Sequence, residues 1–415
     1  MKRLPLPKFL RHYLTFSRPL CWAQLSHQKT RLAVALMGVS FSNILIFTQL
    51  GLRALLFDGV TLVPEHLKGD LFLISTYAPS ISFGSFPQIH LYQADAIAGV
   101  AMASPLYITS APWVNPLALQ QPEEPVGGDK SAAVQPIDAL PYPVKILAFN
   151  PTQPVLNIPE VNQQLEQLQA PGAILFDRLG QPQLGPVPTL VAEQGVLTTV
   201  MNNRKAHVVG LFSMGSTFFD KGHVIMSDWN YARRNGQDSL QKVAVGALTL
   251  EAGVDPITVQ KQISQNLSED VRALTREELL AAEHNFRASF PEGKILNFGA
   301  AIGFIVGVVI VYQVLYTDVS DHLPEYATLK AMGYSDRALL LVVLQEALLL
   351  AVLGFFPGYL TSYWIYDLLT KLTKIPLVMR PEIIVQVFML TLIMCVISGA
   401  IAMNKLRSAD PADVF

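Results

Sequence analysis

Glu346 is the residue whose type and position most directly suggest chemistry. It is the single charged residue in an otherwise apolar run from 338 to 366. A carboxyl group in such a run is a candidate for proton transfer, or for a buried hydrogen bond that holds helices together. Its isolation, about two turns from the start of the run, favours packing or a dimer contact through Gln313, Gln345 or a partner subunit. A proton relay is the alternative.

Motifs for catalysis are absent from the sequence. The segment Gly127-Gly-Asp-Lys-Ser131 is similar to a fragment of a phosphate-binding loop, but it lacks the Gly-Lys pair and a strand–loop–helix setting. There is no H-E-x-x-H or G-x-S-x-G motif, and the 8 histidines are scattered without the spacing of metal ligands. We therefore expect no catalytic, cofactor-binding or metal-binding residue on this chain.

The sequence contains four long apolar runs, at 32–56, 295–316, 338–367 and 383–403, and Glu346 lies in the third of them. A bilayer core needs about 20 apolar residues in a helix, and only helices or closed barrels satisfy their own backbone there. The sequence therefore predicts an α-helical membrane protein with four transmembrane helices in a 1 + 3 layout. Its 415 residues are 51% hydrophobic, and the net charge of −2 argues against a nucleic-acid partner.

The distribution of basic residues predicts the orientation. The segment before the first run carries Lys2, Arg3, Lys8, Arg11, Arg18, Lys29 and Arg31 without an acid. We expect a multi-pass protein of the inner membrane, with segments 1–31, 317–337 and 404–415 in the cytoplasm and 57–294 outside. The 368–382 loop would be external in this orientation. It carries the basic residues Lys371, Lys374 and Arg380, which count against the orientation. The first run is too long for a signal peptide, so we interpret it as a retained anchor.

The external segment is expected to be a folded α/β domain. Two strand–helix–strand units are predicted near its ends, at 70–75, 87–97 and 99–109, and at 243–250, 256–267 and 270–274. Short apolar pieces at 144–149, 173–176 and 207–212 predict a β-rich insertion between them, and 115–136 is a low-complexity loop. Because Cys21 and Cys395 both lie outside 57–294, no disulfide can form within it.

Two helices are predicted to extend the membrane runs into a stalk. Thr275 and Glu278 form a capping-box pattern that starts a helix over 275–290, which could continue directly into the second run. The first run could likewise continue past Arg53 to Val63.

The cytoplasmic segment 317–337 contains a short amphipathic helix. Tyr326, Leu329 and Met332 form its apolar positions, Glu325 and Lys330 lie beside them, and Gly333 is a C-cap. The plain interpretation is a helix lying on the membrane surface.

This helix carries a resemblance to a known family. The run Glu325-x-x-x-Leu329-Lys330-Ala331-x-Gly333 resembles the E-x-x-x-L-[RK]-A-x-G coupling helix of MacB/FtsX-type ABC permeases, which share the 1 + 3 layout. Segment 318–334 and the leader 19–25 are most similar to those of the DevC-like permeases of cyanobacteria. The chain departs from the pattern at Asp321-His322, where many members have an arginine after the acidic residue.

The resemblance implies a permease subunit without its own ATPase. Asp321, Glu325, Tyr326, Leu329, Lys330, Met332 and Gly333 would then contact an ABC ATP-binding subunit, present in two copies and holding ATP and Mg. A homodimer, a periplasmic membrane-fusion protein and a TolC-like outer-membrane protein are implied as partners, with an amphiphile or glycolipid as substrate.

Small residues predict close helix approach at Gly299, Gly303 and Gly307, and at Gly354 and Gly358. Packing within one subunit and packing in a dimer are both open.

Three functions are compatible with the sequence. The chain is an exporter permease, an FtsX-like regulator of an external partner such as a hydrolase, or a sensor or secondary transporter with an external ligand domain.

Overall fold

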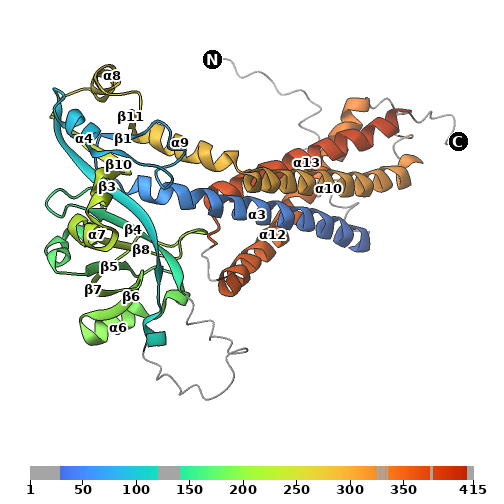
Figure 1. Cartoon of the computed structure of the whole chain (residues 1–415). Coiled ribbons are helices and arrows are strands. Elements are labelled where there is room, and N and C mark those ends of the chain that lie inside the picture. The colour runs from blue at the N-terminus through green and yellow to red at the C-terminus, as the bar shows by residue number, and fades with distance from the viewer. Residues whose placement is uncertain are drawn as a thin grey trace, which may run out of the picture. The chain divides into compact units, whose positions relative to one another are not determined.

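The computed structural model describes residues 29–119, 141–324, 328, 332, 335–373 and 377–408. It divides into two compact units, and Figure 1 labels the helices and strands that build them. The helical unit comprises the chain up to Arg53, residues 295–370 and the chain from Leu377 onward. The α/β unit comprises residues 54–294 and 371–376.

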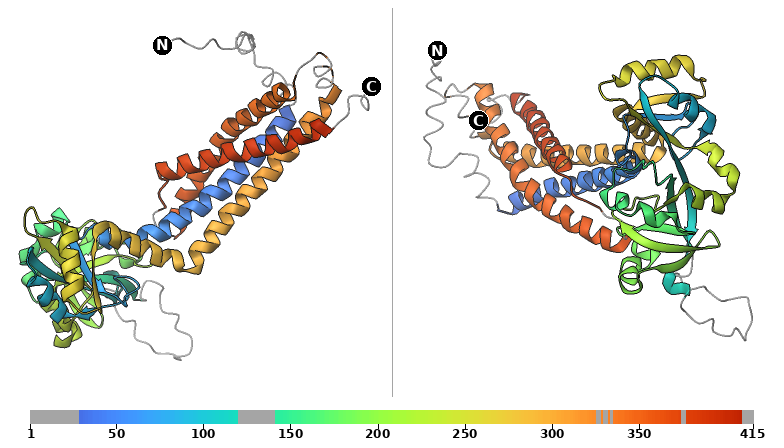
Figure 2. Two further views of the ribbon diagram at one scale, coloured as in Figure 1. Left: turned by 90° about the horizontal axis from the view of Figure 1, so that it is seen from above. Right: turned by 90° about the vertical axis from the view of Figure 1, so that its left-hand side faces the viewer.

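Four long helices build the helical unit, as the sequence predicts. They are α3 (Lys29–Glu65), α10 (Pro291–Asp321), α12 (Asp336–Thr373) and α13 (Pro381–Ser408). Each is long and apolar enough to cross a membrane. Figure 2 shows them side by side. Their buried contact surface is built from small and branched apolar residues, including Ala35, Val39, Val311, Leu315, Ala347, Leu350 and Met394.

The helices extend beyond the predicted runs. Helix α10 continues from 316 to Asp321, and α12 continues to Thr373. The predicted 368–382 loop is therefore helical at both ends, because α13 already begins at Pro381. A proline is tolerated in the first turn of a helix, where its missing N–H would have no partner.

The α/β unit contains a four-stranded antiparallel layer made from both of its ends. One half is β1 (Leu71–Ser75), α4 (Gln88–Asp95) and β3 (Val100–Trp113); the other is β10 (Val245–Leu250), α8 (Pro256–Asn266) and β11 (Val271–Thr275). The strand order is β11-β1-β10-β3, so each half is a split βαβ unit with a strand of the other half inserted. The two predicted strand–helix–strand units are confirmed, and the structure pairs them into one layer.

The central insertion continues the same sheet. It contributes β4 (Tyr142–Phe149), β5 (Ala173–Asp177), β6 (Leu197–Met201), β7 (Arg204–Phe212) and β8 (His223–Ser227) in the order β3-β4-β8-β5-β7-β6. Because β6 returns to β3 through Trp113 and Met201, these six strands form a closed ring. The long strand β3 belongs to both parts, pairing with β10 through Val100–Leu106 and with β4 through Tyr107–Trp113.

Shorter elements complete the unit. They are β2 (Phe86–Pro87), β9 (Lys242–Val243), α5 (Pro159–Asn162), α6 (Val187–Gln194), α7 (Asp228–Asn235) and α9 (Arg276–Ser289), with one-turn helices η1 (Pro116–Leu119), η3 (Leu165–Gln169), η4 (Pro182–Leu184) and η5 (Gln237–Gln241). The predicted loop 115–136 begins at η1, and its part from 120 onward lies outside the described residues.

Apolar residues cover both faces of the sheet. In β1, Leu71 and Leu73 contribute to one core, together with residues of α4 and α8. The alternate residues Phe72 and Ile74 contribute to a second core, which contains Leu279 of α9. Successive side chains of a strand point to opposite faces, and burial on both explains why β1 is apolar at four consecutive positions.

The start of helix α9 agrees with the prediction, but its end does not. Thr275 and Glu278 form the predicted capping box. The predicted continuation into the second apolar run is wrong, because α9 ends at Ser289 and α10 begins at Pro291. Phe290 between them is extended, with φ −73° and ψ 145°. A residue before proline is pushed out of the helical region by the proline ring. Helix α3, in contrast, is continuous through Arg53 to Glu65, as expected.

A buried polar cluster attaches α9 to the rest of the α/β unit. Glu283 of α9 is 2% exposed and accepts hydrogen bonds from the Ser80 hydroxyl at 2.6 Å and the Ile81 amide at 2.7 Å. Nearby, Lys145 pairs with Asp220 at 2.6 Å and donates to Ser82 at 3.2 Å. Burial raises the pKa of the Glu283 carboxyl, and its hydrogen bonds oppose that effect only in part.

We expect the α/β unit to gain stability on mild acidification through Glu283. The pKa of Glu283 is higher in the folded state than in the unfolded state. Its contribution to the stability of the unit is therefore fully present below the unfolded-state pKa and is lost as the pH rises through the folded-state pKa. Glu283→Gln should flatten this pH dependence, as measured by hydrogen exchange of α9 amides. Glu277→Gln, at an exposed position of the same helix, should leave it unchanged. Parallel pH profiles for wild type and Glu283→Gln would contradict the prediction.

Candidate functional site

The predicted coupling segment is described only in part. Asp321 is exposed at the end of α10. Met332 is 63% exposed, and its amide donates to the Thr328 carbonyl at 3.0 Å, which is a helical bond. Glu325, Tyr326, Leu329, Lys330 and Gly333 lie outside the described residues. The role of the segment therefore stays a prediction.

The glycines of α10 face α3 inside the helical unit. A β-carbon added at Gly299 would lie 2.7 Å from Gln49 Cδ, and one at Gly303 would lie 3.2 Å from Leu45 Cβ. One at Gly307 would meet Ser42 at 2.8 Å and would also collide with Met394 of α13. The contacts at Gly299 and Gly307 are closer than real Cβ contacts, and the one at Gly303 is tighter than most, so the missing side chains favour a close approach of α10 and α3.

The glycines of α12 face the same helix. A β-carbon added at Gly354 would lie 2.7 Å from Val39 Cβ, and one at Gly358 would lie 2.8 Å from Asn43 Cβ. All five predicted glycines therefore lie against α3 within one chain. A contribution to a dimer stays a prediction.

Hydrogen bonds between helices accompany this packing. The Ser40 hydroxyl lies 3.0 Å from the Gly354 carbonyl, and the Thr391 hydroxyl 2.7 Å from Asn43 Oδ1. Tyr366 donates to the Phe47 carbonyl, and Ser398 donates to the Val308 carbonyl at 2.8 Å. None of the polar side chains in these hydrogen bonds was predicted from the sequence. The polar triplet Ser40, Ser42 and Asn43 inside an apolar run was the available signal.

Glu346 lies within the buried part of the bundle. Its side chain is 1% exposed, and the next residue, Ala347, is 0% exposed. Both interpretations, packing and proton relay, predict a carboxyl group that is buried inside the bundle, so the burial does not distinguish them. The assignment between them stays a prediction.

Taken together, the five predicted glycines pack against α3 within the helical unit. Within the described part of the chain, no group of three or more His, Cys, Asp or Glu side chains could hold a metal ion. Small residues and interhelical hydrogen bonds hold these helices in close contact.

Comparison with known families agrees with this arrangement. Residues 297–411 match the family described as FtsX-like permease C-terminal. The match runs from the start of the second apolar run through α12 and α13. This part of the chain is therefore similar to the C-terminal domain of FtsX-like permeases.

Two solved structures are similar to the chain over about half its length. The periplasmic region of MacB from Actinobacillus actinomycetemcomitans is 9% identical, with 53% of this chain and 94% of that chain covered and a TM-score of 0.32. The extracellular domain of the noncanonic ABC-type transporter YknZ from Gram-positive bacteria is 10% identical, with 50% and 98% covered and a TM-score of 0.30. No curated protein matches the sequence.

Proposed function

We propose that this chain is the permease subunit of an ATP-driven exporter of the MacB/FtsX type. The observation that carries the proposal is the match of residues 297–411 to the FtsX-like permease C-terminal family. The four long apolar helices and the large α/β unit between the first two of them support it. ATP and Mg would be held by a separate ATP-binding subunit, and this chain would not be catalytic.

The proposed topology follows the basic leader of the sequence. Helices α3, α10, α12 and α13 would cross the inner membrane, with both termini in the cytoplasm. Residues 57–294 would form the periplasmic domain, and 317–337 would face the ATPase.

The proposed assembly is a homodimer with two copies of the ATP-binding subunit. By its resemblance to DevC-like permeases, it would work with a periplasmic membrane-fusion protein and a TolC-like outer-membrane protein. The substrate would be an amphiphile, with a glycolipid as the first candidate. ATP-driven closure of the two ATPases would pull on the coupling segment, and the packed helices would pass the movement to the periplasmic domain.

Continuity of the backbone gives this movement a physical route. Helix α3 runs unbroken from the helical unit into the α/β unit. At its far end, Arg276 of α9 donates to the carbonyls of Pro64 at 3.1 Å and Leu67 at 2.7 Å. The Phe57 and His284 rings also lie 4.4 Å apart. A displacement of α3 would therefore move α9 with it.

Purification from native membranes tests this function. We expect an ATP-binding ABC subunit to co-purify with the tagged chain, together with a membrane-fusion protein. An ATP-binding subunit with a cell-wall or peptide hydrolase in place of the fusion protein would instead favour the regulator. Absence of any ATP-binding subunit from a stable, folded preparation would contradict both functions.

A further inference from the structure

A basic pocket lies in the α/β unit. Its volume is about 300 Å³, and its lining residues are Pro171, Gly172, Arg204, Lys205, His207, Asn230, Arg233 and Arg234. None of them is acidic. Within the described part of the chain, none of the four Arg and Lys side chains forms an ion pair. Four cations therefore share one cavity without a carboxylate.

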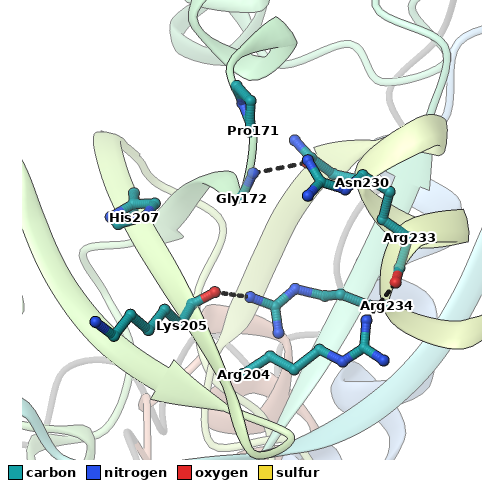
Figure 3. Close-up of a pocket in the computed structure, with 8 residues that line it drawn as sticks. All are labelled: Pro171, Gly172, Arg204, Lys205, His207, Asn230, Arg233 and Arg234. Carbon is teal, nitrogen blue, oxygen red and sulfur yellow. Dashed lines mark hydrogen bonds between the residues drawn. The ribbon is translucent and has the colours of Figure 1, made fainter.

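Two basic pairs from different elements meet here. Arg204 and Lys205 begin β7, immediately after a tight turn at Asn202 and Asn203, which both have positive φ. Arg233 and Arg234 occupy the last turn of α7. Figure 3 shows the Arg204 and Arg234 side chains reaching across from opposite sides: Arg204 donates to the Arg233 carbonyl, and Arg234 donates to the Lys205 carbonyl.

Backbone carbonyls hold these guanidinium groups in place. Arg234 also donates to the Met201 carbonyl at 2.7 Å. The Arg233 guanidinium carbon lies 5.3 Å from the centre of the Trp229 ring. Carbonyl oxygens and an aromatic face orient a guanidinium without neutralising it, so the positive charge stays available to a ligand.

Hydrogen bonds also hold the wall of the pocket formed by Pro171 and Gly172. Asn230 is 2% exposed and accepts a hydrogen bond from the Gly172 amide at 2.8 Å, while its side-chain amide donates to the Ala170 carbonyl at 2.9 Å. This fixes the loop before β5 against α7. A site whose walls are fixed before binding loses less entropy when a ligand enters.

We propose that this pocket binds a phosphate group, either as free phosphate or as part of a phosphorylated headgroup. Arginine presents its donors in a planar fork that matches phosphate oxygens, and charge-assisted bonds of this kind are stronger than neutral ones. A multivalent anion also offsets the mutual repulsion of several cations better than a single carboxylate does. The proposal does not depend on the exporter function, because every lining residue belongs to the α/β unit.

The electrostatics of Arg234 agree with such a ligand. Burial and the neighbouring Arg204 guanidinium lower the pKa of Arg234. An anion between the two guanidinium groups would remove that repulsion.

Titration calorimetry of the full chain in detergent tests the proposal, with inorganic phosphate, glycerol 3-phosphate and acetate as probes. We expect saturable phosphate binding that Arg233→Gln weakens on the order of tenfold. Lys205→Gln is the second variant, because no hydrogen bond of its side chain contributes to the fold of the described residues. Arg272→Gln, which removes an exposed charge from β11, should bind as wild type does.

The probes distinguish the source of the phosphate. Tighter binding of glycerol 3-phosphate would indicate a headgroup, and tighter binding of inorganic phosphate would indicate the free ion. The proposal is overturned if phosphate does not bind, if both variants bind it as wild type does, or if acetate binds equally tightly.

Discussion

Leu329→Asp is expected to abolish co-purification of the ATP-binding subunit while the chain remains inserted and folded. Leu329 lies in the apolar face predicted for the 325–333 helix. An exposed apolar patch on a short helix needs a partner, and docking into a groove is the simplest one. An unpaired charge buried in that groove costs several kcal/mol, which is enough to release the subunit. Affinity purification with quantification of both chains measures the effect.

Ala327→Asp is the matched control for this substitution. Two residues along a helix correspond to about 200° of rotation, so position 327 lies on the opposite side from Leu329. The control should retain the ATP-binding subunit. If Leu329→Asp retains it at wild-type stoichiometry as well, residues 321–335 do not form the coupling contact, and the exporter proposal loses its main sequence support.

Asp177→Ala should destabilise the six-stranded ring by about 3–5 kcal/mol, because it removes a buried carboxylate on which several groups depend. Asp177 is 0% exposed and accepts hydrogen bonds from the amides of Leu179 at 3.0 Å, Met214 at 3.1 Å and Gly215 at 2.8 Å. The buried His223 ring lies 3.5 Å away. Removal of the carboxylate leaves the buried Met214 amide and the two partly buried amides without this acceptor.

Hydrogen exchange of β5 and β8 amides measures this loss within the full chain. Asp177→Asn retains one acceptor oxygen and should lose less stability. Asp238→Ala removes an exposed carboxylate from the same unit and should change exchange little. Equal exchange in Asp177→Ala and Asp238→Ala would show that the carboxylate does not hold the ring together.

Local patterns were sufficient to predict most elements of the fold. Four uninterrupted apolar runs predicted α3, α10, α12 and α13, and short apolar strands next to proline-initiated helices predicted both split βαβ units. The break at Phe290 was missed although Pro291 was visible, because the capping box upstream suggested a longer helix. The closed ring was missed because β3 meets β6 through contacts between residues far apart in sequence.

Site residues were harder to predict for the same reason. The glycine spacing in α10 and α12 indicated close packing, but only the structure identifies α3 as the common neighbour. The pairs Arg204–Lys205 and Arg233–Arg234 are unremarkable surface charges in sequence. They become a pocket only when the start of β7 and the end of α7 meet. No local pattern in the sequence indicates that the start of β7 and the end of α7 lie close together.

The strand order of the α/β unit also bears on how the chain is made. The strands of the closed ring follow one another along the chain between residues 100 and 227, so the ring can close while synthesis continues. Strand β1 emerges earlier, yet its partners β10 and β11 emerge last. Until then β1 exposes unpaired backbone and four large apolar side chains, the kind of edge that promotes aggregation. We therefore expect this early strand to be shielded until its partners are synthesised.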